Sequence, residues 1–281
     1  MKLSAWHKQN GDNVEWYFPF YKYDRVYMSK VFTFTTDYPY PINADKIIKG
    51  GTGYNYPDGG GVLPHEIEHI YPDYGLYPEY TKDTAYGFMT RGCPRGCDFC
   101  IVKHKEGRKS VKVSDLSEFW RDQKNISLCD PNMFACKEWA DLAEQLIASK
   151  AYIDFNQGVD IRIMTDDKIQ AIRKMKIKRI HFAWDRYEDK DMIVPKFKMF
   201  QEITGWERHK MTVYCLVNFD TTLEQDLDRI YTLRDLHYQP YVMIFNKDST
   251  TPVDRVRKLQ RYVNSPRIFN SVKTFDEYER Y

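Results

Sequence analysis

Three of the six cysteines lie close together in the segment RGCPRGCDFC, as Cys93, Cys97 and Cys100. Cysteine thiolates bind metal ions and iron–sulfur clusters, and they also act as nucleophiles. Gly92 and Gly96 stand in the same segment, and glycine reaches the backbone angles that a loop wrapped closely around a bound group requires. This segment is therefore the first candidate for a functional site.

A structural zinc site is one interpretation of these cysteines. Zinc needs four nitrogen or sulfur ligands in tetrahedral geometry, usually supplied as two close pairs. The other cysteines, Cys129, Cys136 and Cys215, form no second close pair, so His104 would have to complete the site. An iron–sulfur cluster fits the spacing better, because three thiolates on a four-iron cluster leave one iron free to bind a small molecule.

A second candidate motif is HEIEH, which matches the HExxH pattern of zinc metalloproteases. On a helix this spacing places His65 and His69 on one face, with Glu66 as a general base. Pro64 precedes the motif and Pro72 follows it closely, which leaves at most about two helical turns. The sequence offers no convincing third ligand downstream, so a short surface helix is the favoured interpretation.

The composition is that of a globular protein. Of the 281 residues, 42 % are hydrophobic and 29 % are charged, and the sequence contains no apolar run long enough to span a membrane. The first residues, MKLSAWHKQNG, lack the apolar stretch of a secretory signal. We therefore expect a cytoplasmic protein with no membrane partner, in which thiols stay reduced and a cysteine cluster indicates metal binding or catalysis. The net charge of +2 leaves nucleic-acid binding undetermined.

From about residue 86 onward, short apolar runs alternate with segments of helical spacing, which is typical of successive βα units. The predicted strands are residues 86–90, 126–130, 152–155, 179–184, 212–217 and 241–245. An apolar stripe of Trp139, Leu142 and Leu146 predicts one of the helices, and the capping-box spacing of Thr221 and Glu224 predicts the start of another. The fold class is thus α/β, and six such units fit an open, partial (β/α)6 barrel with ligand groups at the carboxyl ends of its strands.

Residues 1–85 differ from the rest because they are rich in Tyr, Pro and Gly. VEWYF, RVYMSKVFTF and KIIKGG predict three strands, and MKLSAWHKQNG predicts a helix closed by Gly11. A Rossmann-like layer normally has a strand before its first helix, so we hypothesise that the chain begins partway into such a domain. We predict a small α/β domain at residues 1–85, the barrel core at 86–250, and a C-terminal helix and tail at 251–281 that pack on the barrel.

The cysteine segment resembles the signature of the radical S-adenosylmethionine (radical SAM) superfamily. That signature is CxxxCxΦC, with an aromatic residue before the third cysteine, and Phe99 fills this place. The segment also follows the first predicted strand, which is where the family carries it. The resemblance covers about residues 86–250, and its specific part is the cysteine loop.

The resemblance implies that Cys93, Cys97 and Cys100 bind a 4Fe-4S cluster whose open iron binds S-adenosylmethionine. A reductant such as flavodoxin or ferredoxin would supply one electron, and cleavage would release a 5′-deoxyadenosyl radical that abstracts hydrogen from a substrate. The resemblance thus implies an enzyme, an oxidoreductase or transferase, whose substrate and reaction the sequence does not identify. The alternative is an iron–sulfur or zinc protein with an electron-transfer or structural role and no radical chemistry.

The resemblance also implies cofactor contacts by Phe99 and by polar residues at the ends of the later strands. These residues are Asp130 and Asn132 in CDPN, Gln157, Asp160 and Arg162 in NQGVDIR, Trp184 and Asp185 in FAWD, and Asn218 in LVN. Asp130 and Asn132 stand where the family has a Gly-Gly-Glu-like segment, so they depart from its pattern. For every polar residue in this set, a solvated side chain at a strand end is the alternative interpretation.

Residues 1–85 resemble a shortened cobalamin-binding domain in the order of their elements. The cobalamin motif is Asp-x-His-x-x-Gly, and an alignment on His7 places Ala5 and Asn10 where the Asp and the Gly belong. We therefore do not expect cobalamin as a cofactor.

Overall fold

The chain folds as a mixed α/β structure with parallel sheets, and the computed structural model describes residues 1–246 and 253–279. One parallel sheet has the order β3-β6-β7-β8, with strands at Thr84–Gly87, Asn125–Leu128, Tyr152–Phe155 and Lys176–Ile177. The other has the order β9-β10-β11, with strands at Ile180–Ala183, Met211–Val217 and Gln239–Ile244. The predicted α/β class is confirmed, and each of the six predicted strands overlaps an observed strand.

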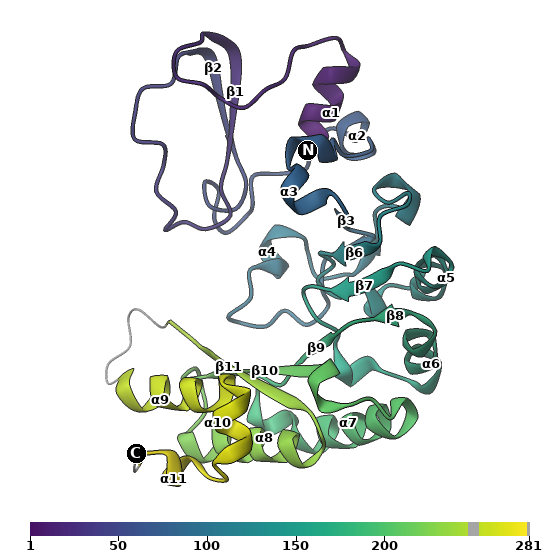
Figure 1. Cartoon of the computed structure of the whole chain (residues 1–281), viewed down its shortest axis with the longest axis vertical. Coiled ribbons are helices and arrows are strands. Elements are labelled where there is room, and N and C mark those ends of the chain that lie inside the picture. Colours follow the sequence, from purple (N-terminus) through teal and green to yellow (C-terminus); the bar gives the residue numbers. More distant parts are fainter. Residues whose placement is uncertain (247–252, 280–281) are drawn as a thin grey trace.

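The two sheets adjoin at β7 and β9. Just after β7, the Val159 N–H donates to the His181 carbonyl of β9 at 2.7 Å. Figure 1 shows the strands following one another along a curve, with helices on its outer side and an open side opposite them. The inner face of this curve is called the concave face below.

A helix follows each of the strands β6, β7, β9, β10 and β11. These helices are α5 (Trp139–Ser149), α6 (Asp166–Lys174), α7 (Lys190–Thr204), α8 (Leu223–Asp235) and α9 (Val253–Asn264). Two short helices, α10 (Pro266–Ser271) and α11 (Phe275–Glu279), complete the described C-terminal part. No helix among the described residues is long and apolar enough to cross a bilayer.

Successive side chains of each strand point to opposite faces of the sheet. The side chains that face the helices are apolar and at most 3 % exposed, and they include Ile126, Leu128, Ile153, Phe155, Phe182, Val213 and Cys215. Burying one Val, Ile, Leu or Phe side chain contributes about 1.5–3 kcal/mol. The helical side of the sheets therefore stabilises the fold, and the concave face is left to polar residues.

The start of α8 differs by one residue from the prediction. Its N-cap is Thr222, whose hydroxyl accepts from the Gln225 N–H while the Gln225 side chain accepts from the Thr222 N–H. The predicted pair, Thr221 and Glu224, is wrong, because the Thr221 hydroxyl donates to Asp226 at 2.6 Å. Either of two adjacent threonines can serve as the N-cap. Because the Thr221 hydroxyl is bonded to Asp226, Thr222 is the residue that caps the helix.

The N-terminal part contains two parallel strands, β1 (Tyr23–Ser29) and β2 (Ala44–Gly50), instead of the predicted three. VEWYF forms no strand, because the Phe18 N–H donates to the Tyr23 hydroxyl at 3.1 Å rather than to another strand. The predicted first helix is confirmed as α1 (Lys2–Gln9), and Gly11 has a φ of 85°, which suits glycine after a helix end. His7 is buried and joins α1 to β1, since its Nε2 lies 2.8 Å from the Tyr27 hydroxyl.

Candidate active site

The cysteine loop follows β3 and the short strand β4 (Thr90–Arg91), which pairs with β5 (Val111–Lys112). Gly92 enters the loop with a φ of +84°, and a Cβ there would lie 2.1 Å from the Lys109 carbonyl oxygen. Only glycine allows this close approach of the two backbones. The Cys93 N–H donates to the Gly107 carbonyl at 3.2 Å, and the Cys100 N–H donates to the Cys97 carbonyl at 3.1 Å. Backbone contacts therefore fix both ends of the loop.

The three loop cysteines are free thiols and partly buried. Burial raises the pKa of the Cys97 thiol; the nearby Arg162 charge opposes this, and the neighbouring Cys100 and Cys93 thiols add to it. The thiols thus lie close enough to affect one another electrostatically, and cysteine thiolates are the ligands that hold iron–sulfur clusters. Within residues 1–246 and 253–279, no group of three His, Cys, Asp or Glu side chains is already arranged as a metal site.

Asn132 and Asp160 connect the cysteine loop to the segments that follow β6 and β7. The Asn132 Nδ2 donates to Cys93 Sγ at 3.6 Å and to Asp160 Oδ2 at 3.4 Å. Asp160 also accepts from Arg95 Nε at 2.5 Å and from Arg162 Nε at 2.8 Å. These polar residues form one network with the loop, in which the side chains of Asn132 and Asp160 are buried and Arg95 is exposed.

The charge of Asp160 is stabilised within this network. Burial by itself raises the pKa of Asp160, but the charges and hydrogen bonds of Arg162 and Arg95 outweigh it, and the pKa lies below its ordinary value. Arg162 also pairs with Asp189 at 3.0 Å. The network therefore holds the Arg162 charge beside Cys97, where it opposes in part the rise in pKa that burial causes.

Asp130 is as deeply buried as Asn132, at 3 % exposure, but it lies under the start of the loop. Its Oδ1 accepts from the Thr90 N–H at 2.5 Å and from the Thr90 hydroxyl at 2.6 Å, and its Oδ2 accepts from the Met89 N–H at 3.1 Å. These hydrogen bonds hold the chain between β3 and β4 against the end of β6. They give Asp130 a positioning role beneath the cysteine loop, and its predicted cofactor contact stays a prediction.

The ionisation of Asp130 predicts a pH dependence of stability. Burial raises the pKa of Asp130 to about 6, although the hydrogen bonds from Thr90 and Met89 oppose it. A folded-state pKa above the unfolded one means that the contribution to stability is full below about pH 4 and is lost as pH rises through 6. A pKa difference of about two corresponds to on the order of 3 kcal/mol.

We expect the wild-type protein to lose up to about 3 kcal/mol of unfolding free energy between pH 4 and pH 7 relative to Asp130→Asn. Asparagine keeps an acceptor oxygen and has no charge, so it is the matched reference. Urea denaturation of both proteins across this range measures the difference. An unfolding free-energy difference between the two proteins that stays constant with pH would contradict the prediction.

Trp184 and Asp185 are neighbours in sequence and lie on opposite faces of the sheet. Trp184 is fully buried on the helical side, and its indole N–H donates to the Arg186 carbonyl at 2.9 Å. Asp185 lines the cavity of the concave face, accepts from the Leu216 N–H at 3.3 Å, and has a pKa raised by burial. We therefore assign Trp184 to the core and keep Asp185 as the candidate for ligand contact.

Asn218 and Arg229 hold the carboxyl ends of β9, β10 and β11 together. Asn218 has a φ of 63° and donates from Nδ2 to the Phe245 carbonyl at 3.3 Å. Arg229 of α8 is completely buried and donates to three carbonyl oxygens and one carboxylate, namely Trp184 O, Asp185 O, Leu216 O and Asp226 Oδ1. The sequence interpretation did not identify Arg229, because an Asp and an Arg three residues apart also describe an exposed helical pair.

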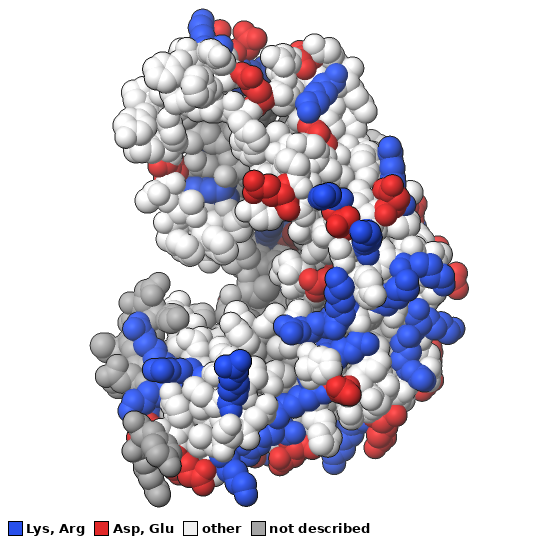
Figure 2. Space-filling model, in the orientation of Figure 1, with Lys and Arg blue, Asp and Glu red and all other residues white. Residues whose placement is uncertain are grey.

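A cavity of about 1470 Å³ lies against the concave face of β9, β10 and β11. Phe99, Cys100 and Gln157 line it, so it reaches the cysteine loop, and the Phe99 ring also meets the edge of Phe219 with 5.5 Å between ring centroids. Figure 2 shows a deep notch at the open side of the curved strands. Of the residues predicted to contact a cofactor, Phe99, Gln157 and Asp185 line this cavity, together with the predicted cluster ligand Cys100.

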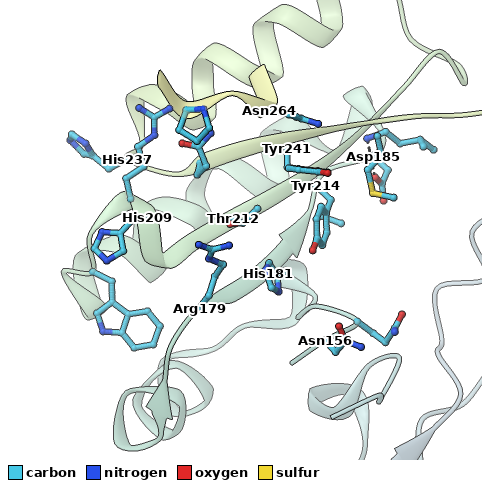
Figure 3. A pocket seen from close by; sticks show the side chains of 18 of the residues that line it. Asn156, Arg179, His181, Asp185, His209, Thr212, Tyr214, His237, Tyr241 and Asn264 are labelled. Carbon is cyan, nitrogen blue, oxygen red and sulfur yellow. Dashed lines mark hydrogen bonds between the residues drawn. The ribbon is translucent and has the colours of Figure 1, made fainter. Parts of the chain in front are cut away.

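The concave face also carries polar and aromatic residues that the sequence interpretation did not identify. Neighbouring strands bring them into rows: His181 lies beside Thr212, and Tyr214 lies beside Tyr241. Figure 3 shows these side chains pointing into the cavity, with Arg179 next to His181. The signal was available in the alternation Arg179, His181, Asp185, which places charged residues on one face of a strand whose other face is apolar.

The HExxH motif forms the short helix α2 (His65–Glu68), as expected. The rings of His65 and His69 lie 4.3 Å apart, and His69 Nδ1 lies 2.7 Å from Glu118 Oε2. His69 of the motif is thus paired with Glu118, which lies outside the motif. In the part of the chain that the structure describes, these residues do not form a metal-binding group.

Comparisons with protein-family models and with curated proteins found no match to this chain.

Proposed function

We propose that the protein is a radical SAM enzyme and that β3, β6, β7, β9, β10 and β11 form its partial (β/α)6 barrel. One observation carries the proposal: a loop with three thiols and an adjacent aromatic residue borders a large cavity at the end of it that lies by the carboxyl ends of parallel strands. Ligands of parallel α/β folds bind at this edge.

Cys93, Cys97 and Cys100 would hold the 4Fe-4S cluster. When bound, the cluster supplies the electron for cleavage of S-adenosylmethionine to a 5′-deoxyadenosyl radical. Asn132 donates a hydrogen bond toward Cys93 Sγ, and Arg162 places positive charge near Cys97. Hydrogen bonds to sulfur tune an attached cluster.

Residues of the cavity would bind and orient the small molecules. Phe99 offers an aromatic surface at the cluster end, and Gln157 and Asp185 offer hydrogen-bonding groups in the same cavity. Because single-ligand sites commonly have volumes of about 300–1,000 Å³, a cavity of about 1470 Å³ has room for S-adenosylmethionine and a substrate together. The strands and helices on three sides would limit the access of water to the reacting groups.

The test is reductive cleavage of S-adenosylmethionine. The protein is reconstituted with iron and sulfide under anaerobic conditions, then given dithionite and S-adenosylmethionine, and 5′-deoxyadenosine is measured by chromatography. We expect 5′-deoxyadenosine only when reductant is present. Bound iron and sulfide without cleavage would contradict the proposal and favour an electron-transfer protein, and a colourless protein with one zinc ion would exclude both iron–sulfur functions.

A further inference from the structure

Several buried polar atoms on the walls of the concave face have no hydrogen-bond partner among the described residues. They belong to Asp154, His181, Gln201 and Arg208, and each of these residues lines the large cavity or a second cavity of about 530 Å³ beside it. Asp154 Oδ1 and His181 Nδ1 lie 4.0 Å from each other, which is beyond hydrogen-bond distance, so Gln201 and Arg208 carry the argument. Buried polar atoms are nearly always paired in folded proteins. Their concentration on this face therefore indicates a surface built to meet a polar ligand.

Arg208 is the strongest of these groups. It stands in η6 (Arg208–Lys210), directly before β10, and its Nη1 donates to Asn270 Oδ1 at 2.9 Å. Its Nε and Nη2 are buried, and it forms no ion pair with a described carboxylate. Burial and the Arg234 charge lower the pKa of Arg208, so an anion beside it would relieve an unfavourable charge.

Arg179 is a second cation at the same end of the cavity. It is exposed and lines both cavities, and its side chain has no ion pair or hydrogen bond among residues 1–246 and 253–279. Figure 3 shows Arg179, His209 and His237 toward one end of the cavity and Asp185 toward the other. The acidic side chains nearby are Glu207, which is exposed and lies 3.2 Å from His209, and Asp154, which lines the second cavity together with Arg179.

The two ends of the cavity are separated by the length of a strand. Arg208 precedes β10, whereas Phe99 contacts Phe219, which follows β10. Seven residues of strand at about 3.3 Å each place these ends about 20 Å apart. Between them, the rings of Tyr214 and Tyr241 meet edge to face at 5.7 Å, and His181 stacks on Tyr214 at 5.4 Å.

We propose that the substrate is an elongated anion whose phosphate or carboxylate group binds Arg208 and Arg179, while its reacting part lies at the cysteine loop. The assignment of the reacting end rests on the proposed radical SAM function. A guanidinium binds either kind of anion through paired N–H groups. The aromatic rings between the two ends would hold the middle of the molecule.

Isothermal titration calorimetry with inorganic phosphate and with succinate, at constant ionic strength, tests the anion site. We expect the wild-type protein to bind at least one of these probes, and Arg208→Gln and Arg179→Gln each to bind it at least tenfold more weakly. Tighter binding of phosphate would indicate a phosphorylated substrate, and tighter binding of succinate would indicate a carboxylate. Arg173→Gln is the matched control, because Arg173 is an exposed arginine on α6, and it should bind as the wild type does.

Three results would overturn the anion site: no binding of either probe, unchanged binding in both cavity variants, or equal weakening in Arg173→Gln. Circular dichroism confirms that each variant is folded, and Arg208→Lys, which keeps the charge without the planar fork, should bind with intermediate affinity. The titration contains no reductant and no S-adenosylmethionine. A failure of the cleavage reaction and a failure of the anion site are therefore separate results.

Discussion

Replacing Cys97 with alanine is expected to abolish both cluster binding and the cleavage of S-adenosylmethionine. Of the three cysteines outside the loop, Cys136 and Cys215 are buried in the core, and Cys129 follows β6 with a pKa raised by burial. Iron and sulfide content after reconstitution and the yield of 5′-deoxyadenosine measure the two losses. We expect the yield to fall to the level found without protein.

Cys215→Ala is the matched control for this experiment. Cys215 is fully buried on the helical face of β10, and burial raises the pKa of its thiol to about 12. A thiol that stays protonated is no ligand for iron. The control should keep its cluster and its activity, at a cost of about 1 kcal/mol in stability. Full cleavage by Cys97→Ala, or equal loss in both variants, would contradict the assignment of the cysteine loop.

Replacing Arg229 with methionine is expected to destabilise the protein by on the order of 3–5 kcal/mol, because it leaves the Asp226 carboxylate buried and uncompensated. Three carbonyl oxygens at the ends of β9 and β10 also lose their donor. Such a loss corresponds to a decrease of about 10 °C in the thermal midpoint. Thermal denaturation followed by circular dichroism measures it.

Two further variants separate this effect from a general loss of charge. Arg173→Met removes an exposed arginine of α6 and should change stability by less than about 0.5 kcal/mol. Arg229→Met combined with Asp226→Leu removes both buried charges and should recover part of the loss. If Arg229→Met unfolds at the wild-type temperature, the buried guanidinium does not hold the strand ends.

The sequence was sufficient to predict six of the seven strands of the two large sheets, because buried parallel strands are short apolar runs between turn signals, but the two-residue strand β8 was not predicted. It was not sufficient for VEWYF, which has the composition of a strand. A strand needs a partner, and the Phe18 N–H bonds the Tyr23 hydroxyl. Pairing is a tertiary property that a local pattern does not contain.

The candidate site was predicted in part, for a related reason. The structure places Asn132, Asp160 and Arg162 near the cysteine loop, and their predicted cofactor contacts stay predictions. Trp184 and Asp185 could be assigned to faces only by the pairing of β9 with β10. The partners of Asp130 are 40 and 41 positions away along the chain. Arg208 and Arg179 precede their strands. The expectation that ligand groups lie at the carboxyl ends of the strands therefore did not include them.

The contacts of the cysteine loop have a consequence for the thermodynamics of ligation. Arg95 belongs to this loop, and its ion pair with Asp160 joins residues 65 positions apart. With the Cys93 N–H bond to Gly107, this pair orders the loop through the chain's own contacts. Ordering a flexible backbone costs about 1–2 kcal/mol per residue, and a preformed loop does not incur this cost again on binding. The affinity of the three thiols for a metal ion or cluster would thus depend partly on Asp160, because the segment after β7 must be folded for Asp160 to order the loop.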